Sequence, residues 1–242
     1  MGFPSRNLFL VGKRSPCVSI QCLVYIWKTR LKHSTIFKYE CSDPRGCKVA
    51  HLSKEQEIKL FGKWSFAGIE VKDHGLKRYL SLKPIYVPHS MGRHEHGRFR
   101  KAEINIVERF INNLMRPGIS AGKKARSINV LRNSFEIIHL RTGQNPIETL
   151  VKAVEHSAPC EDTTRISYGG VVYHMAVDIS PQRRVDISLR FLTEGARKAS
   201  FGNPRPLEEC VAEELILAAS KDMKSYAVSK RHEMERVARA SR

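Results

Sequence analysis

The sequence has no apolar run of about 18 residues, the length that a helix needs to cross a bilayer. It also has no match to four motifs of common enzyme classes, namely G-x-x-x-x-G-K-[ST], G-x-G-x-x-G, G-x-S-x-G and H-E-x-x-H. These absences exclude the most frequent nucleotide, hydrolase and zinc-protease sites. We therefore predict no catalytic activity, no cofactor and no membrane partner.

Paired cysteines are missing as well, since none of the six cysteines forms a C-x-x-C pair. Cys41 and Cys47 with His51 allow a zinc interpretation, but the spacing is loose and a second ligand pair is lacking. The three histidines at positions 89, 94 and 96 could also suggest a metal site, but neither a helix nor a strand would place all three on one face. We favour free thiols in a reducing compartment and predict no metal site.

Acidic residues are absent from positions 1–39, which carry seven Lys/Arg. This composition overlaps with that of organelle transit peptides, which are basic and poor in acids. The alternatives are an unstructured basic extension, or a translation start assigned too early. We treat residues 1–57 as a basic N-terminal extension.

Positive charge is in excess over the whole chain of 242 residues, with a net charge of +18 and a pI near 9.9. Such an excess favours polyanions, nucleic acid first and anionic membrane surfaces second. Residues 1–57 hold 10 Lys/Arg against 4 Asp/Glu, residues 58–101 hold 10 against 3, and residues 102–242 hold 22 against 17. In the last segment the cations must therefore share a face to create a basic surface.

Residues 58–101 are rich in glycine and proline and short of periodicity, so they predict an irregular arm with a short helix around Leu76–Leu82. The arm ends in Gly97-Arg-Phe-Arg-Lys101. Cations alternating with glycine are typical of a loop that lies along phosphates. Arg98, Arg100 and Lys101 are therefore candidate RNA-binding residues.

Residues 102–242 predict a mainly α fold, with about six helices and one protruding β-hairpin. The second helix ends at Gly143, and the third begins with Asn145 as its cap and Pro146 in its first turn. The last helix, 225–240, has only a thin apolar stripe of Tyr226, Met234 and Val237, so we expect it to lie across the surface.

Two β-type runs at about 163–178 flank Gly169-Gly170, which can take the positive φ angles of a two-residue hairpin turn. Ser180-Pro181 then predicts a helix start with a capping hydroxyl. Tyr168 lies at the tip, where its ring either stacks on a base or packs against the end of its own strand.

Arginines recur every seven residues in the helix that follows the hairpin, at Arg183, Arg190 and Arg197. This spacing returns each side chain to within about 20° of the last. Arginine suits structured RNA because it pairs phosphate with two hydrogen bonds and stacks on bases. The other candidate cations are Lys123, Lys124, Arg126, Arg132, Arg165, Arg184 and Lys198.

Six blocks together resemble the universal small-subunit ribosomal protein family that is number seven in bacterial naming and number five in the older eukaryotic naming. The resemblance runs from about residue 58 to residue 242, and several blocks look like the eukaryotic cytosolic branch. The blocks are Ile58-Lys-Leu-Phe-Gly-Lys-Trp-Ser65, Gly97-Arg-Phe-Arg-Lys-Ala102, Ile106-Val-Glu-Arg109, Phe135-Glu-Ile-Ile-His-Leu140, Thr142-Gly-Gln-Asn-Pro146 and Ser180-Pro-Gln-Arg-Arg-Val-Asp186.

The resemblance implies a helical rRNA-binding domain on the 3′ major domain of small-subunit rRNA, where the family helps to assemble the head. It further implies a hairpin close to the exit-site tRNA and the mRNA exit channel, beside proteins of the head and platform. By position, rRNA would contact Lys123, Lys124, Arg126, Arg183, Arg184, Arg190 and Arg197, and the tip would comprise Tyr168, Gly169, Gly170, Val171 and Val172. The expected location is the cytoplasmic ribosome.

Two other classes of protein stay open on the residues alone. An RNA-processing or RNA-modifying enzyme would use the same basic surface but needs a metal or cofactor pocket. A histone-like DNA packager would bind duplex DNA as well as folded RNA.

Overall fold

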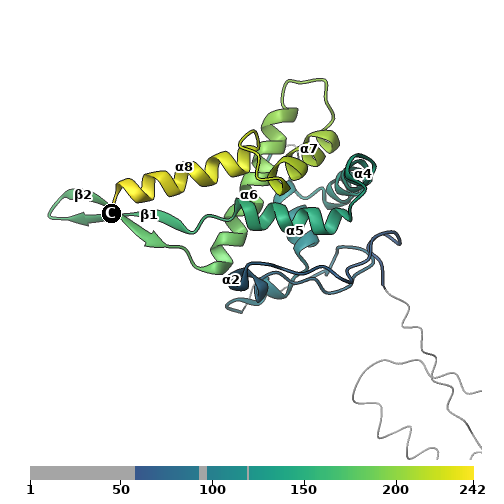
Figure 1. The fold of residues 1–242 in the computed structure, drawn as a ribbon, viewed down its shortest axis with the longest axis horizontal. Helices are drawn as coiled ribbons and strands as arrows, with labels where there is room; N and C mark the ends of the chain where they lie inside the picture. The colour runs from purple at the N-terminus through teal and green to yellow at the C-terminus, as the bar shows by residue number, and fades with distance from the viewer. Residues whose placement is uncertain (1–57, 93–96, 119) are drawn as a thin grey trace, which may run out of the picture. The chain divides into compact units, whose positions relative to one another are not determined.

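The computed structural model describes residues 58–92, 97–118 and 120–242 (Figure 1). The predicted basic extension and transit-peptide alternative therefore lie outside the described residues. So do Cys41, Cys47, His51, His94 and His96 of the zinc alternatives.

Six long helices and one antiparallel hairpin occur in the described part of residues 106–240, which confirms the predicted mainly α fold. The irregular arm that precedes them contains a short helix, α2 (His74–Lys77), and a 3-10 helix, η2 (Arg100–Glu103). The long helices are α3 (Ile106–Leu114), α4 (Lys124–Thr142), α5 (Pro146–Ser157), α6 (Pro181–Ser200), α7 (Leu207–Ala219) and α8 (Tyr226–Ala240).

Local signals set most of the helix ends. Gly143 takes a φ of 67° directly after α4, and the Asn145 side chain accepts a 3.1 Å hydrogen bond from the Ile147 amide at the start of α5. The prediction that the Ser180 hydroxyl caps α6 was wrong, because this side chain makes no hydrogen bond to the first turn of the helix. Pro181 occupies the first turn of α6, where its fixed φ already suits a helix.

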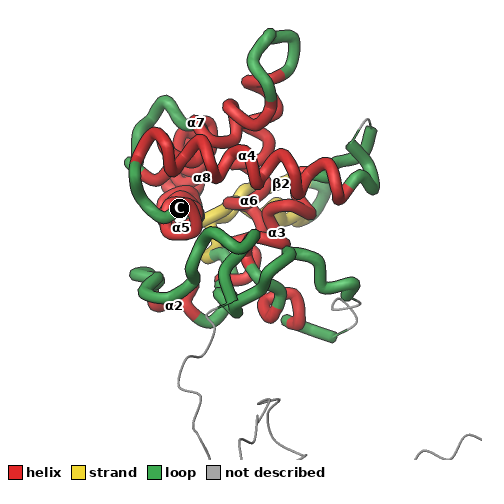
Figure 2. Tube along the Cα trace, turned by 90° about the vertical axis from the view of Figure 1, so that its right-hand side faces the viewer, coloured by secondary structure: helices red, strands yellow, loops and turns green. Residues whose placement is uncertain are grey.

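One hydrophobic core joins the arm to the helices. Phe110, Phe135 and Leu189 are fully buried within it, and the arm contributes Leu60 and Leu76. Helix α7 packs against α4, α5 and α6, and the arm lies along one side of these helices (Figure 2). The arm is therefore held in place by burial of its apolar side chains.

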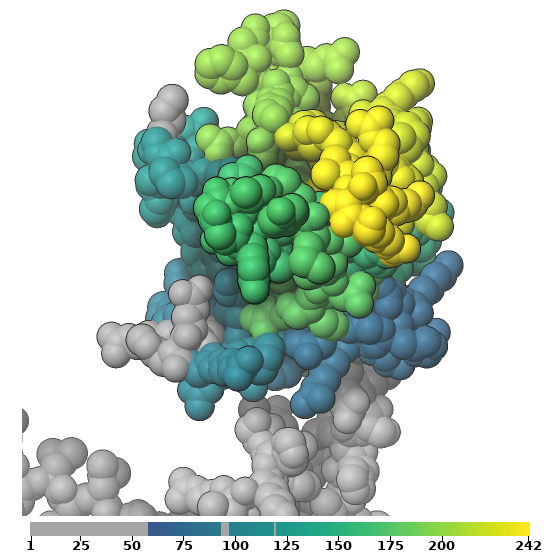
Figure 3. Space-filling model, turned by 90° about the vertical axis from the view of Figure 1, so that its left-hand side faces the viewer, coloured from purple at the N-terminus to yellow at the C-terminus, as the bar shows by residue number. Residues whose placement is uncertain are grey.

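The hairpin pairs β1 (Glu161–Tyr168) with β2 (Val171–Asp178) and extends away from the helices (Figure 1). Gly169 and Gly170 have φ angles of 58° and 86°, the positive values that the turn requires. The predicted hairpin is confirmed, although β1 begins two residues earlier than expected. Helix α8 lies beside the base of the hairpin. Figure 3, which views the molecule from the left-hand side of Figure 1, also shows the two next to each other.

Helix α8 buries a different face from the one expected. Ala227, Val228, Glu235 and Ala238 are buried, whereas Val237 is 49% exposed. Glu235 turns inward because its carboxylate accepts hydrogen bonds from the Cys160 amide at 3.2 Å and from Arg231 Nε at 3.1 Å. A buried carboxylate with one partner before β1 and another on α8 itself thus overrides the thin apolar stripe.

Among the described residues, no helix reaches the length and hydropathy that a bilayer crossing requires.

Candidate nucleic-acid interface

Three arginines of α6, which we call the arginine row (Arg183, Arg190 and Arg197), occupy one 20-residue helix. Arg183 and Arg190 are exposed and Arg197 is half-buried, while Leu189 and Leu192 of the same helix are in the core. Arg183 lies 3.5 Å from Asp162, with 65% of its side chain exposed. The row extends over about 21 Å of helix at 1.5 Å per residue.

Arg184 follows Arg183 directly but is engaged within the fold. Its Nη2 lies 3.0 Å from Asp73 Oδ2, and its Nε donates a 3.1 Å hydrogen bond to the Pro159 carbonyl. Only 14% of the side chain is exposed. The guanidinium therefore ties α6 to the arm, and its contact with RNA stays a prediction.

The start of α4 carries three cations with different surroundings. Lys123 and Arg126 are exposed, but the Nζ of Lys124 lies 2.6 Å from Oε1 of Glu108, which is buried. Burial raises the pKa of Glu108, and hydrogen bonds from Lys124 and Ser90 outweigh it, so this pKa is held below its usual value. The anion beside Lys124 thus comes from α3 of this chain.

Two further cations of the predicted set also meet internal carboxylates. The Nζ of Lys101 lies 3.8 Å from Asp186, and the Nζ of Lys198 lies 3.1 Å from Glu194 and 2.8 Å from the Tyr226 hydroxyl. The hydrogen bonds that Lys198 donates to Tyr226 and Glu194 raise its pKa. Five of the thirteen predicted cations therefore form salt bridges. The eight that form none with the described residues are Arg98, Arg100, Lys123, Arg126, Arg132, Arg165, Arg190 and Arg197.

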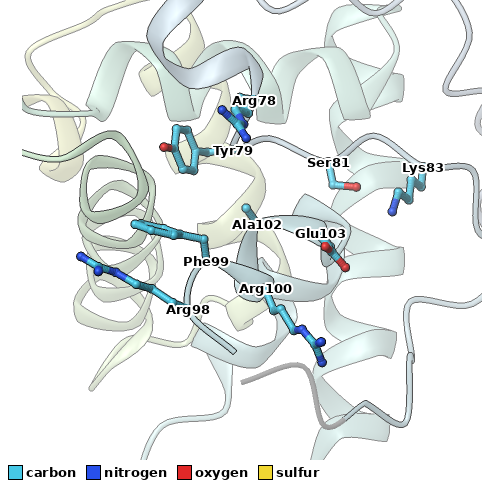
Figure 4. Close-up of a pocket in the computed structure, with 9 residues that line it drawn as sticks. All are labelled: Arg78, Tyr79, Ser81, Lys83, Arg98, Phe99, Arg100, Ala102 and Glu103. Carbon is cyan, nitrogen blue, oxygen red and sulfur yellow. The ribbon is translucent and has the colours of Figure 1, made fainter. Parts of the chain in front are cut away.

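The structure brings Arg98 and Arg100 together in a pocket of the arm that the sequence did not predict (Figure 4). Arg78 and Lys83 line the same pocket, next to the rings of Tyr79 and Phe99. A signal for it exists in the sequence, because aromatic residues follow or separate cations in Lys77-Arg78-Tyr79 and Arg98-Phe99-Arg100. Such interleaving is typical of surfaces that bind single-stranded nucleic acid.

The hairpin tip is open to solvent. Tyr168 is 81% exposed, and Val171 and Val172 are each 54% exposed. No aromatic partner of Tyr168 occurs among the described residues. The Tyr168 ring therefore packs little against its own strand end, and its role as a stacking face stays a prediction.

The parts of the chain that the structure describes contain no group of three His, Cys, Asp or Glu side chains able to hold a metal ion.

Comparison with known proteins places these features in a family. Residues 76–242 match the family model described as ribosomal protein S7p/S5e. A protein of Cenarchaeum symbiosum named small ribosomal subunit protein uS7 is 50% identical over 199 residues, covering 79% of this chain and 100% of the relative. Proteins of the same name from Methanothermobacter thermautotrophicus and Methanosphaera stadtmanae are 50% and 49% identical, over 75% and 76% of this chain and 98% of each relative.

Proposed function

Because this chain belongs to the ribosomal protein S7p/S5e family, we propose that its free cations bind the 3′ major domain of small-subunit rRNA. The protein is a structural constituent of the small ribosomal subunit and takes part in translation. Its family is non-enzymatic, so the alternative of an RNA-processing enzyme has no support. Its location is that of the ribosome, which we take to be in the cytoplasm.

The observation that carries this proposal is the set of eight cations that form no salt bridge with a described residue. They come from the arm, from α4 and the residue before it, from β1 and from α6, and all but Arg197 are exposed. Unpaired guanidinium and ammonium groups are free to replace the counterions of a phosphate backbone. Binding would place the protein in the head of the subunit, where it would help the head to assemble.

The hairpin supports a second, finer part of the proposal. Its exposed side chains include Ile166, Tyr173, Met175 and Val177, which share one face of the two strands because Ile166 pairs with Tyr173 and the other two follow at intervals of two residues. A monomeric protein rarely leaves so much apolar surface uncovered. We propose that the hairpin is covered in the subunit, with its tip close to exit-site tRNA and mRNA and this apolar face against neighbouring head and platform proteins.

The test measures binding of the full chain to a transcript of the 3′ major domain and to duplex DNA, at matched salt. We expect a clear preference for the transcript and a steep loss of affinity as salt rises. A variant with all three residues of the arginine row changed to Gln should keep its melting temperature and bind the transcript more weakly.

A control variant removes the same charge elsewhere. Lys72, Lys221 and Lys224 are exposed and form no salt bridge with a described residue, so changing them to Gln matches the loss of three charges. Equal affinity for the transcript and for duplex DNA would contradict the proposal. An equal effect of the two triple variants would show that total charge, rather than the arginine row, governs binding.

A further inference from the structure

The arm contains a pocket of about 470 Å³, formed where the segment that follows α2 meets η2. In Figure 4 the Phe99 ring lies on one side of this pocket near Tyr79, and Arg98 and Arg100 extend along its lower edge. Ligand pockets typically measure 300–1,000 Å³, so a single nucleotide fits. We propose that this pocket holds one unpaired guanine nucleotide of rRNA; the inference rests on the proposed function and identifies what this part of the interface recognises.

The pocket offers a stacking surface. Phe99 is 50% exposed, and its ring centroid lies 6.5 Å from that of Tyr79, with an angle of 63° between the planes. The Arg98 guanidinium carbon lies 5.1 Å from the Phe99 centroid. Phe99 has a φ of 65°, an uncommon value for a bulky residue, and the structure thus holds an aromatic ring at the surface in a strained backbone. A base released from its own stack would find a partner on this ring.

The cations of the pocket form no salt bridge with a described residue. Arg78, Lys83, Arg98 and Arg100 all line it, and none makes a salt bridge or side-chain hydrogen bond with another described residue. Four like charges around one cavity repel one another unless an anion is present. Phosphates on either side of a bound base would supply that anion, and arginine can bind them with two parallel hydrogen bonds.

One carboxylate, that of Glu103, lies among these cations on η2, and it too has no partner in the described part of the chain. A site for phosphate alone would disfavour a carboxylate, because both are negative. An ionised carboxylate only accepts hydrogen bonds, and it does so through two oxygens. The Watson–Crick edge of guanine presents two neighbouring donors, N1–H and N2–H, whereas adenine and cytosine place an acceptor nitrogen beside their amino group. Glu103 therefore selects guanine.

A further polar group of the pocket lacks a partner. The Ser81 hydroxyl is buried and makes no hydrogen bond with the described residues, although buried hydroxyls normally have a partner. Ser81 lines the pocket from the side opposite Arg98 in Figure 4. A nucleotide in the pocket would provide atoms with which this hydroxyl could pair after a small rotation.

The test compares full-chain variants in binding to a transcript of the 3′ major domain at fixed salt. Phe99→Leu keeps apolar volume but removes the stacking ring, and Glu103→Gln keeps shape but replaces one acceptor with a donor. Tyr86→Leu and Glu70→Gln are the matched controls, since both residues are exposed in the same arm and neither lines the pocket. Circular dichroism melting of each variant verifies that it folds.

We expect Phe99→Leu to weaken binding roughly 5- to 160-fold, the range found when a base loses an aromatic stacking partner. Kethoxal, which modifies N1 and N2 of unpaired guanine, should leave one guanine unmodified in the wild-type complex and modify it in the Glu103→Gln complex. Changing that guanine to adenine should weaken wild-type binding and have little further effect on Glu103→Gln.

Wild-type binding together with pocket variants that match their controls in affinity and kethoxal pattern would overturn the pocket and leave the proposed function standing. Failure of the wild-type chain to prefer the transcript over duplex DNA would overturn both. The two failures are therefore distinguishable in one set of measurements.

Discussion

The buried guanidinium of Arg109 on α3 donates a 2.8 Å hydrogen bond to Oδ1 of Asp186 on α6. A second hydrogen bond, 3.0 Å long, runs from Arg109 to the Tyr79 carbonyl in the arm. One side chain that is 3% exposed therefore joins α3, α6 and the arm that carries the pocket. Both Arg109 and Asp186 belong to sequence blocks that resemble the family, and their role here is structural.

Asp186→Asn should destabilise the fold, because it leaves the buried Arg109 charge without its counter-charge. Breaking a buried pair costs about 3–5 kcal/mol, and we expect roughly 2–3 kcal/mol because Asp186 itself is 36% exposed. Urea unfolding followed by circular dichroism measures the difference. Asp178→Asn, at an exposed site on β2, is the control and should change the free energy of unfolding by less than about 0.5 kcal/mol. Equal effects of the two changes would refute a structural role for the pair.

Glu108→Gln tests the carboxylate that is paired with Lys124. Because the pKa of Glu108 in the folded state lies below its ordinary value of 4.5, its stabilising effect is present above pH 4.5 and is lost as the pH falls through the lower value. The melting temperatures of wild type and variant should differ most near pH 7 and converge at acidic pH. We expect a loss of about 3 kcal/mol at pH 7.

The matched control for Glu108 is the exposed pair of Lys63 and Glu136, whose atoms are also 2.6 Å apart. Glu136→Gln should cost less than about 1 kcal/mol, since water screens an exposed pair. If both variants were equally destabilised, burial would not be the reason for the strength of the pair at Glu108.

Gly195→Ala should destabilise the protein even though alanine is the better helix former. An added Cβ would lie 2.8 Å from the Cβ of Tyr226 and 3.1 Å from the Glu214 carboxyl carbon, so α6 would have to move away from α8. Overpacking of this kind costs about 1–3 kcal/mol. Thermal melting measures it, with Ala199→Gly at an exposed site of α6 as the control for helix propensity alone, worth about 1 kcal/mol. A rise in melting temperature for Gly195→Ala would show that the close approach is not limiting.

Gly170→Val should loosen the hairpin and leave the helices unchanged, because valine tolerates a φ of 86° poorly. Hydrogen exchange should quicken for the amides of β1 and β2, while those of α5 and α6 keep their protection. Gly170→Asn is the control, since asparagine adopts positive φ more readily than other residues. Faster exchange throughout the chain would mean that the hairpin contributes to the stability of the core.

Sequence patterns predicted the elements well where the signal lies within a few residues. Gly169-Gly170, Gly143 and the Asn145-Pro146 pair each place a turn or a helix end through backbone preferences of their own. The face of α8 was missed because Glu235 is buried by partners at Cys160 and Arg231, and no periodicity reveals such a pairing.

The candidate site was likewise predictable from the sequence only where the signal lies within one helix. The seven-residue spacing placed the arginine row on one helix, since a helix brings such positions onto one side. That Arg184 binds Asp73, 111 residues away, could not be read from the sequence, and neither could the meeting of Arg78 with Phe99 in one pocket.

The amino-acid sequence by itself determined the basic character of this protein, its helices and its hairpin turn, because charge, periodicity and backbone preference belong to residues close together in the chain. Only the tertiary structure decided which cations are neutralised by internal carboxylates and which form no salt bridge with a described residue. That choice depends on contacts between distant segments, which form when burial of the common core brings the arm, α3 and α6 together.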